Sequence, residues 1–245
     1  MIARRAAITL LPILALGACG QRAEPAVAVA NDSTPAPTAS AATPIPRPAP
    51  APTAILTCRA QIGAAAAAAK VATCRNVSPA THPPCNAANS CAMIDDEIAR
   101  SCALFAGDGA PMAGCTVDPK SAKAAADVVR RYYDAIGARD YATAWAQWGE
   151  NGRPGQTLEG FTRGFADTRA VSVTIGTPGQ GDAAAGSVYQ PVPVTVDAAL
   201  ADGRRQRFIG TYVLRRVNDV DGASAAQLRW HIDSAKLRET PPAAQ

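Results

Sequence analysis

The chain contains few of the residues on which most enzyme active sites depend. Its 245 residues include two histidines and twelve aromatic side chains (three Trp, five Tyr and four Phe), and its net charge is only +4. The small charge argues against a nucleic-acid partner, and the shortage of histidine removes the usual residue of acid–base and metal chemistry. The sequence also has no phosphate-binding glycine loop, no Gly-x-Ser-x-Gly motif and no His-Glu-x-x-His motif. It therefore predicts no cofactor and no metal.

The sequence has no apolar run long enough for a permanent transmembrane helix, but it has a shorter apolar run at the N-terminus. Arg4 and Arg5 precede the run at residues 6–16, which is shorter than the roughly 20 residues that span a bilayer. This pattern is typical of an export signal. The four residues from Leu16 to Cys19 then resemble the lipobox of bacterial lipoproteins. An ordinary cleaved leader with an incidental cysteine is the alternative.

The lipobox resemblance implies a signal peptide at residues 1–18 and lipidation of Cys19. Each methylene of the attached acyl chains, palmitate among them, adds about 0.8 kcal/mol when it is buried in the membrane. We therefore expect a lipoprotein on the periplasmic side of the bacterial envelope, with the membrane as its partner through the N-terminal lipid. Gly20, in place of the aspartate that directs retention in enteric bacteria, favours the outer membrane over the inner membrane.

Large side chains are almost absent from residues 19–54, where Ala, Pro, Thr and Val predominate. Such a segment cannot bury a core and favours extended conformations. We predict that these residues form the lipid anchor and a disordered tether.

Cysteine is confined, after Cys19, to residues 55–117, and none follows. The six cysteines of this segment are Cys58, Cys74, Cys85, Cys91, Cys102 and Cys115. An even number in an exported chain predicts disulfides, although the sequence leaves their pairing open. The segment has no Cys-x-x-Cys pair and only His82 nearby. Zinc binding and thiol–disulfide catalysis are therefore less favoured interpretations than structural disulfides.

Two helices are expected in the cysteine segment. Residues 64–71 are nearly all alanine, a strong helix former, and Ser90 can cap a helix over residues 91–105. Cys91 and Cys102 share one face of that second helix, because eleven residues is close to three turns. We expect both to face the alanine helix, which Cys58 and Cys74 flank. Residues 55–117 are thus predicted to be a disulfide-stapled helical module.

The larger apolar side chains gather after residue 118, first with the spacing of helices. We expect Asp118 as N-cap and Pro119 as first residue of a long helix that ends at Gly137. Its apolar face contains Val128, Val129, Tyr132 and Ile136, while Arg130, Arg131 and Asp134 point away from that face. Asp140 and Thr157 are the expected caps of two further helices.

The apolar period then changes to two, which predicts strands. Alternation occurs at residues 171–175, 192–196, 205–217 and 228–233, and Asp202 with Gly203 forms a hairpin turn before the third of these segments. Helices followed by hairpin-linked strands predict an α+β fold, with helices packed on one face of an antiparallel sheet.

The helical segment VVRRYYDAIGARDYATAWAQW, the segment FTRGFADT and the closing hairpins resemble the nuclear transport factor 2-like superfamily, which includes ketosteroid isomerases and polyketide cyclases. The resemblance implies a C-terminal cone of helices packed on a curved antiparallel sheet at residues 118–238, followed by a disordered tail at 239–245. It also implies a pocket at one end of the cone. The residues expected to line that pocket are Tyr132, Trp145, Trp148, Phe161, Phe165, Tyr212 and Trp230.

Isomerases of this superfamily need a carboxylate base in an apolar cavity, besides a hydroxyl such as that of Tyr132. Glu150 is the only carboxylate in the loop at residues 149–156, and this loop has the composition of a solvated turn. Asp197, His231 and Asp233 are out of phase with their apolar neighbours and are expected on the outer face of the sheet. We therefore name no catalytic residue, and the balance of the sequence is against an enzyme.

The sequence thus favours an envelope lipoprotein with a non-catalytic binding or interaction role. Its partner would be another envelope protein or a small apolar ligand. One alternative is a pocket enzyme of isomerase or cyclase type that acts on a small apolar carbonyl compound, with Tyr132 as oxyanion donor. Another is a purely structural envelope protein.

Overall fold

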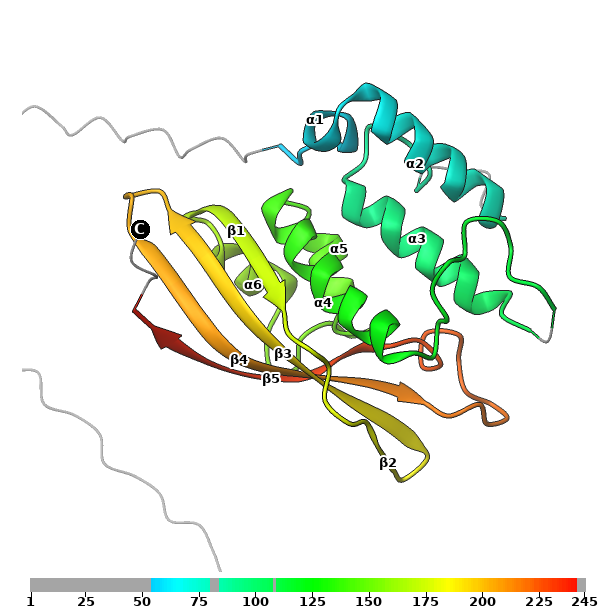
Figure 1. Cartoon of the computed structure of the whole chain (residues 1–245). Coiled ribbons are helices and arrows are strands. Elements are labelled where there is room, and N and C mark those ends of the chain that lie inside the picture. The colour runs from blue at the N-terminus through cyan, green and yellow to red at the C-terminus, as the bar shows by residue number, and fades with distance from the viewer. Residues whose placement is uncertain (1–53, 80–83, 108, 242–245) are drawn as a thin grey trace, which may run out of the picture. The chain divides into compact units, whose positions relative to one another are not determined.

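The computed structural model describes residues 54–79, 84–107 and 109–241 (Figure 1). The expected signal peptide, Cys19 and the tether up to residue 53 lie outside the described residues, as does His82. All described residues belong to one compact unit of the chain. None of the described helices has both the length and the apolar content needed to cross a membrane.

The cysteine segment forms a helical module as predicted, but with three helices in place of the two expected. They are α1 (Cys58–Ile62), α2 (Ala64–Val77) and α3 (Cys91–Leu104), and α2 lies beside α3. Ser90 caps α3, because its hydroxyl accepts a hydrogen bond from the backbone N–H of Met93 at 3.0 Å. Gly63, with φ of 84°, makes the turn between α1 and α2. The alanine helix is longer than expected and ends at Val77.

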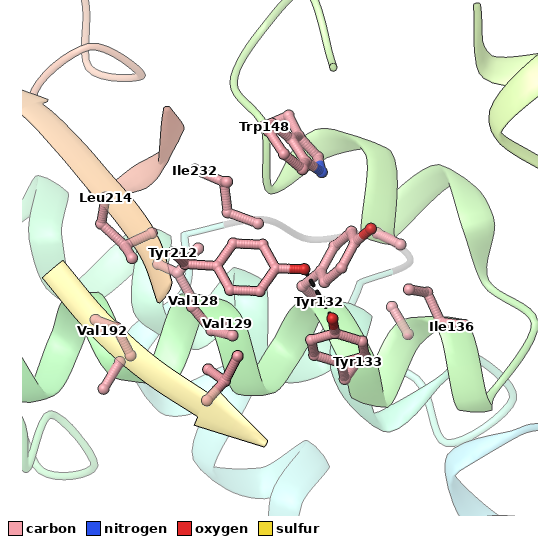
Figure 2. Close-up of a cluster of buried hydrophobic side chains, with 14 of the residues drawn as sticks. Val128, Val129, Tyr132, Tyr133, Ile136, Trp148, Val192, Tyr212, Leu214 and Ile232 are labelled. Atoms are coloured by element: carbon pink, nitrogen blue, oxygen red, sulfur yellow. Dashed lines mark hydrogen bonds between the residues drawn. The ribbon is translucent and has the colours of Figure 1, made fainter. Parts of the chain in front are cut away.

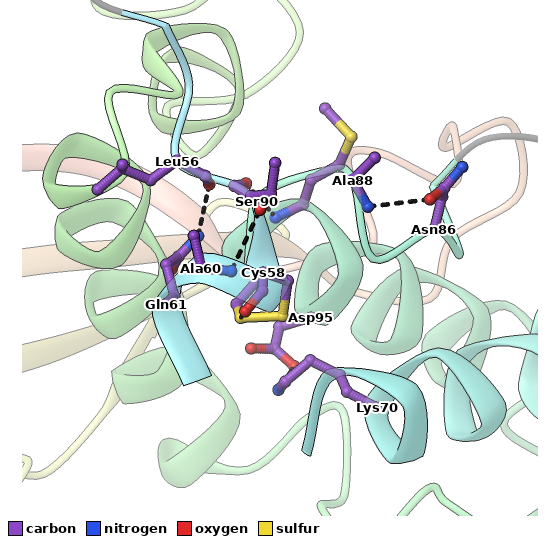
Figure 3. Close-up of a disulfide and its surroundings, with 12 residues drawn as sticks. Leu56, Cys58, Ala60, Gln61, Lys70, Asn86, Ala88, Ser90 and Asp95 are labelled. Atoms are coloured by element: carbon purple, nitrogen blue, oxygen red, sulfur yellow. Dashed lines mark hydrogen bonds and ion pairs between the residues drawn. A yellow bond between two sulfur atoms is a disulfide. The ribbon is translucent and has the colours of Figure 1, made fainter. Parts of the chain in front are cut away.

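Three disulfides staple this module: Cys58–Cys91, Cys74–Cys85 and Cys102–Cys115. The first links α1 to α3 (Figure 3). The expectation that Cys102 also faces the alanine helix is wrong, because Cys102 pairs with Cys115 in the segment that follows α3. Cys102 lies in the last turn of α3, where the returning chain comes within reach across a separation of 13 residues.

The cone begins with α4 (Ala122–Gly137), α5 (Tyr141–Ala146) and α6 (Leu158–Gly164). Asp140 and Thr157 cap α5 and α6 as predicted, and α4 ends at Gly137. The predicted start of α4 is wrong, since its N-cap is Ser121, whose hydroxyl accepts from Ala124 N–H at 3.2 Å. Asp118 instead lies in a turn. Its side-chain oxygen accepts a hydrogen bond from Lys120 N–H, and its backbone carbonyl accepts one from Ser121 N–H.

Five strands follow: β1 (Thr168–Ile175), β2 (Asp182–Ala184), β3 (Ser187–Leu200), β4 (Arg205–Val217) and β5 (His231–Thr240). They form one antiparallel sheet in the order β1-β3-β4-β5, and β2 pairs with the start of β3. The last strand was expected at residues 228–233, but it runs from His231 into the predicted tail. Leu228 belongs to a turn, where its N–H bonds the Ser224 carbonyl at 3.1 Å, and β4 supplies pairing partners as far as Thr240.

Helices α4, α5 and α6 cover one face of the curved sheet, which confirms the predicted α+β fold (Figure 1). The core lies between α4 and the sheet. Its buried side chains come from alternate positions of the strands and from α4 (Figure 2), and they include Val128, Val129, Ile136, Val192, Val194, Val196, Leu214 and Ile232.

The stapled module joins the cone through two helix caps. Ser90, which caps α3, donates its hydroxyl proton to Asp140 Oδ2 at 2.6 Å, and Asp140 caps α5 by accepting from Thr143 N–H at 3.1 Å. Both side chains are almost fully buried. The N-termini of α3 and α5 are therefore fixed to each other by a hydrogen bond between the residues that begin them.

Candidate functional site

Six of the seven residues predicted for the pocket meet in one aromatic cluster inside the cone. The ring of Tyr132 lies 6.2 Å from those of Trp148 and Phe161 and 6.1 Å from that of Tyr212. Phe161 also contacts Trp145 and Phe165, at 5.5 and 5.1 Å. Tyr132, Trp148, Phe161 and Tyr212 are buried. Their role as the lining of a pocket stays a prediction, since these rings pack against one another.

Three tyrosine hydroxyls contribute polar groups to this cluster. The hydroxyls of Tyr133 and Tyr212 share a hydrogen bond of 2.7 Å (Figure 2). Burial is the main cause that raises the pKa of Tyr132, Tyr133 and Tyr212 above the usual value of a phenol, so all three are neutral at pH 7. The sequence prediction missed Tyr133; its signal was the position next to Tyr132 on a helix that is buried on more than one side.

Arg153 lies beside this cluster. The guanidinium of Arg153 lies 5.2 Å from the centre of the Trp148 ring, and its charge lowers the pKa of the three tyrosines against the larger effect of burial. Trp148 Nε1 is buried and makes no hydrogen bond of ordinary geometry among the described residues, although its N–H is close enough to the Tyr132 hydroxyl to lower the pKa of that group. The aromatic cluster thus offers N–H and O–H donors from Trp148 and the tyrosines.

A carboxylate base is missing from this cluster. The groups that shift the pKa of Tyr132 are its own burial, Tyr212, Trp148 and Arg153. Glu150 is exposed, and Asp197 forms an ion pair with Arg207 at 2.8 Å across the outer face of the sheet, as expected. None of the groups that shift the pKa of Tyr132 is therefore a carboxylate or a histidine.

A groove of about 280 Å³ lies between the stapled module and the cone. Helix α3, the segment from Gly114 to Pro119 and helix α4 form its walls, and the Cys102–Cys115 disulfide belongs to one wall. Its apolar lining comes from both parts of the structure and comprises Ile98, Ala99, Cys102, Ala103, Val117, Pro119, Ala124, Val128 and Trp230.

Trp230 belongs to the same buried core as the aromatic cluster, but its ring contacts no other aromatic ring among the described residues. It lines the groove and also a second hollow of about 230 Å³, to which Trp145, Gln147 and His231 contribute. The Arg216 guanidinium stacks 5.3 Å from its ring centre, and its Nε1 is buried without a partner among the described residues. Burial is the main cause that lowers the pKa of the nearby His231, so this histidine is neutral at pH 7.

One carboxylate joins α3 to three parts of the cone beside the groove. Asp96 accepts from Arg229 at 2.8 Å and from Gln147 Nε2 at 3.2 Å, and it pairs with Arg131 Nε at 3.5 Å. Burial raises the pKa of Asp96, but the two arginine charges and the hydrogen bonds outweigh it, so the pKa lies below its usual value. The carboxylate is therefore ionised at neutral pH and faces two cations.

Sequence reasoning did not find this charge cluster, which we call the Asp96 cluster (Asp96, Arg131, Gln147 and Arg229). It placed Arg131 on the polar face of the long helix, which is correct, but Arg131 is covered by α3, while Arg130 and Asp134 on the same face are exposed. Asp96 and Arg229 are 133 residues apart, and nothing local in the sequence indicates that they meet. Among the described residues, no group of His, Cys, Asp and Glu side chains could hold a metal ion.

Comparisons with known proteins add two solved structures. A candidate scytalone dehydratase from Novosphingobium aromaticivorans DSM 12444 is 15% identical, covers 49% of this chain and 83% of its own, and has a TM-score of 0.36. A candidate dehydratase of the NTF2-like family from Streptomyces avermitilis is 14% identical, covers 49% of this chain and 97% of its own, and has a TM-score of 0.33. At these values neither protein transfers an activity to this chain. No protein-family model and no curated protein matches it.

Proposed function

We propose that this protein is an envelope lipoprotein with a non-catalytic binding role, anchored through Cys19. Its ligand would be an apolar molecule or an apolar segment of another envelope protein, held in the groove between the stapled module and the cone. The single observation that carries the proposal is this groove of about 280 Å³, which has apolar walls from both parts. Its charged lining consists of three arginines and three aspartates: Arg130, Arg131, Arg229, Asp95, Asp127 and Asp134. Concave, mostly apolar sites with a few polar groups are typical of ligand binding.

The interior of the cone supports binding over catalysis. Its rings fill the space between α4 and the sheet, and its hydroxyls lack a neighbouring base. The groove, in contrast, has rigid walls, because the Cys102–Cys115 disulfide holds one side and the Asp96 cluster fixes α3 to the cone. A purely structural protein would have no need of such a hollow.

The proposal is tested by filling the groove. Ala103 is half-buried in its wall, and Ala106 is an exposed residue outside it. Ala103→Trp places an indole in the groove, and Ala106→Trp is the matched control. Chemical crosslinking in native membranes, followed by purification of the full chain, should yield a partner or extracted apolar ligand with wild type and the control, and none with Ala103→Trp. Equal recovery from all three would contradict the proposal.

A pocket enzyme acting on a small apolar carbonyl compound is the second candidate, and the tyrosine cluster favours it. A Tyr132 hydroxyl beside the Trp148 N–H could donate to an oxygen that gains negative charge. Phenol is a suitable probe, since it combines an apolar ring with such an oxygen. If phenol can enter the cone and bind beside Tyr132, it should quench tryptophan fluorescence in wild type and quench it much less in Tyr132→Phe. The absence of saturable quenching in wild type would remove this candidate.

A further inference from the structure

The outer face of the sheet is the side that α4, α5 and α6 leave uncovered (Figure 1). The strand register determines which side chains share it. Val192, Val194 and Tyr212 point into the core, so the alternate residues of β3 and β4 point outward. Because β5 pairs with β4, the outward residues of β5 lie beside those of β4, with Lys236 opposite Thr211 and Arg238 opposite Ile209.

Basic side chains dominate this face. The five outward cations are Arg205, Arg207, Arg215, Lys236 and Arg238. Two carboxylates lie among them: Asp197, which pairs with Arg207, and the exposed Asp233 beside the irregularity in β5. Five positive minus two negative charges leave a surplus of +3 on this face. The face is therefore basic.

Three of these cations are free to meet an external anion. Arg205, Lys236 and Arg238 are exposed, and none of them has an ion-pair partner among the described residues, where Arg207 by contrast is held by Asp197. Between them lies Ile209, an apolar side chain that is 37% exposed. The exposed strands β4 and β5 thus present an apolar centre surrounded by unpaired positive charge, which we call the basic sheet face (Arg205, Ile209, Lys236 and Arg238).

We propose that the basic sheet face docks on the surface of an anionic lipid bilayer. Lipid phosphates match a broad surface on which the cations are spread over two strands, because basic residues near such a surface each add to the attraction without requiring a fixed partner geometry. Ile209 suits the boundary between headgroups and acyl chains. A second copy of this chain is a poor occupant, since back-to-back packing would set one surplus of +3 against another.

This inference does not depend on the anchor at Cys19 or on the groove. It concerns a contact made by the folded cone itself, so a chain without the lipid retains it. The test therefore uses the full chain carrying Cys19→Ser in every sample, and the N-terminal segment then contributes equally to all of them.

The experiment measures co-sedimentation with vesicles of phosphatidylcholine, with and without phosphatidylglycerol, at low and high salt. The variant is Arg205→Gln/Lys236→Gln/Arg238→Gln. Its matched control, Arg59→Gln/Arg75→Gln/Lys123→Gln, removes the same charge from exposed positions on the helices. A conservative variant, Arg205→Lys/Arg238→Lys, keeps the charge and alters only the side chains. Thermal melts of all four chains verify that the sheet is intact.

The proposal expects binding that requires phosphatidylglycerol and falls with salt. Each basic residue contributes about fivefold to partitioning, so the triple variant should bind roughly 100-fold more weakly, while the control and the lysine variant bind as wild type. Equal loss in variant and control would overturn the proposal, since net charge alone would then act. Absence of lipid binding, with polyglutamate binding or dimerisation sensitive to the triple variant, would overturn it in favour of an acidic protein or a second copy.

Discussion

Asp96 is one of the residues that link the stapled module to the cone. It brings one negative charge from α3 to Arg131 of α4 and to Arg229 before β5. Removing it would leave two partly buried cations facing each other without an acceptor. Breaking a buried ion pair in this way is costly, whereas loss of an exposed pair is nearly neutral.

We predict that Asp96→Asn lowers the free energy of unfolding by about 3 kcal/mol, the low end for a buried pair, because the carboxylate retains 24% exposure. Asp95→Asn is the matched control. Asp95 pairs with Lys70 near the surface (Figure 3), and its loss should cost less than about 1 kcal/mol. Urea denaturation measures both values. Similar costs for the two variants would show that the Asp96 cluster is not buried.

The pH dependence of stability provides a second measurement on Asp96. The pKa of Asp96 is lower in the folded chain than in the unfolded chain. The contribution of this carboxylate to folding stability is therefore fully present above the unfolded pKa of about 3.9. That contribution is lost as the pH falls through the folded pKa. The difference in unfolding free energy between wild type and Asp96→Asn should therefore be constant from neutral pH to about pH 5 and shrink below about pH 4. A difference that does not change with acid would contradict this assignment.

At the scale of elements, covalent links stabilise helices that have little to pack. Helix α2 buries only Ala67, Val71, Cys74 and Val77, so its apolar contribution is small. Each disulfide of the module joins a helix to a neighbouring helix or segment, and α3 takes part in two of the three. The stability of the module and of one wall of the groove therefore depends on these disulfides.

We predict that removing a disulfide costs more when the link closes a longer loop. In the chain-entropy account, Cys58→Ala/Cys91→Ala, which opens a separation of 33 residues, should cost about 4 kcal/mol. Cys102→Ala/Cys115→Ala opens 13 residues and should cost about 3 kcal/mol. Thermal unfolding of the double variants measures both.

Intact-mass analysis after thiol blocking provides the control for these variants. The untreated chain should show no free thiol among the six cysteines from Cys58 to Cys115. A blocked thiol in wild type, or the reverse order of stabilities, would count against the pairing.

At the scale of the whole molecule, the groove and the basic sheet face are separate surfaces of one compact unit. The groove and the basic sheet face are built from different elements, α3 with α4 in one case and β4 with β5 in the other. Binding in the groove would therefore leave the basic sheet face free, and a membrane contact and a ligand could be held together.

We predict that Cys19→Ser moves the protein from the membrane fraction to the soluble periplasm and abolishes incorporation of labelled palmitate. The physical reason is the loss of the acyl chains, whose buried methylenes add about 0.8 kcal/mol each. Cell fractionation at high salt makes the measurement, because salt weakens any contact made by the basic sheet face. Palmitate labelling that persists in Cys19→Ser would reject the anchor.

The sequence by itself determined the features that depend on neighbouring residues. The caps at Ser90, Asp140 and Thr157, the end of α4 at Gly137 and the hairpin before β4 are all set by side chains within a few positions of the backbone they affect. The α+β order followed from the change of apolar period. The predicted start of α4 was wrong although it too depends on neighbouring residues, because Ser121 competes with Asp118 as a cap and occupies the N-cap position in the structure.

Only the tertiary structure decided which distant residues meet. The disulfide pairing, the extent of β5, the Asp96 cluster and the groove with Trp230 all depend on contacts between segments far apart in the chain. A polar helix face looks the same in sequence whether water or another helix covers it. Arg131 shows the consequence: its position on α4 was correct, and its burial against α3 followed from packing alone.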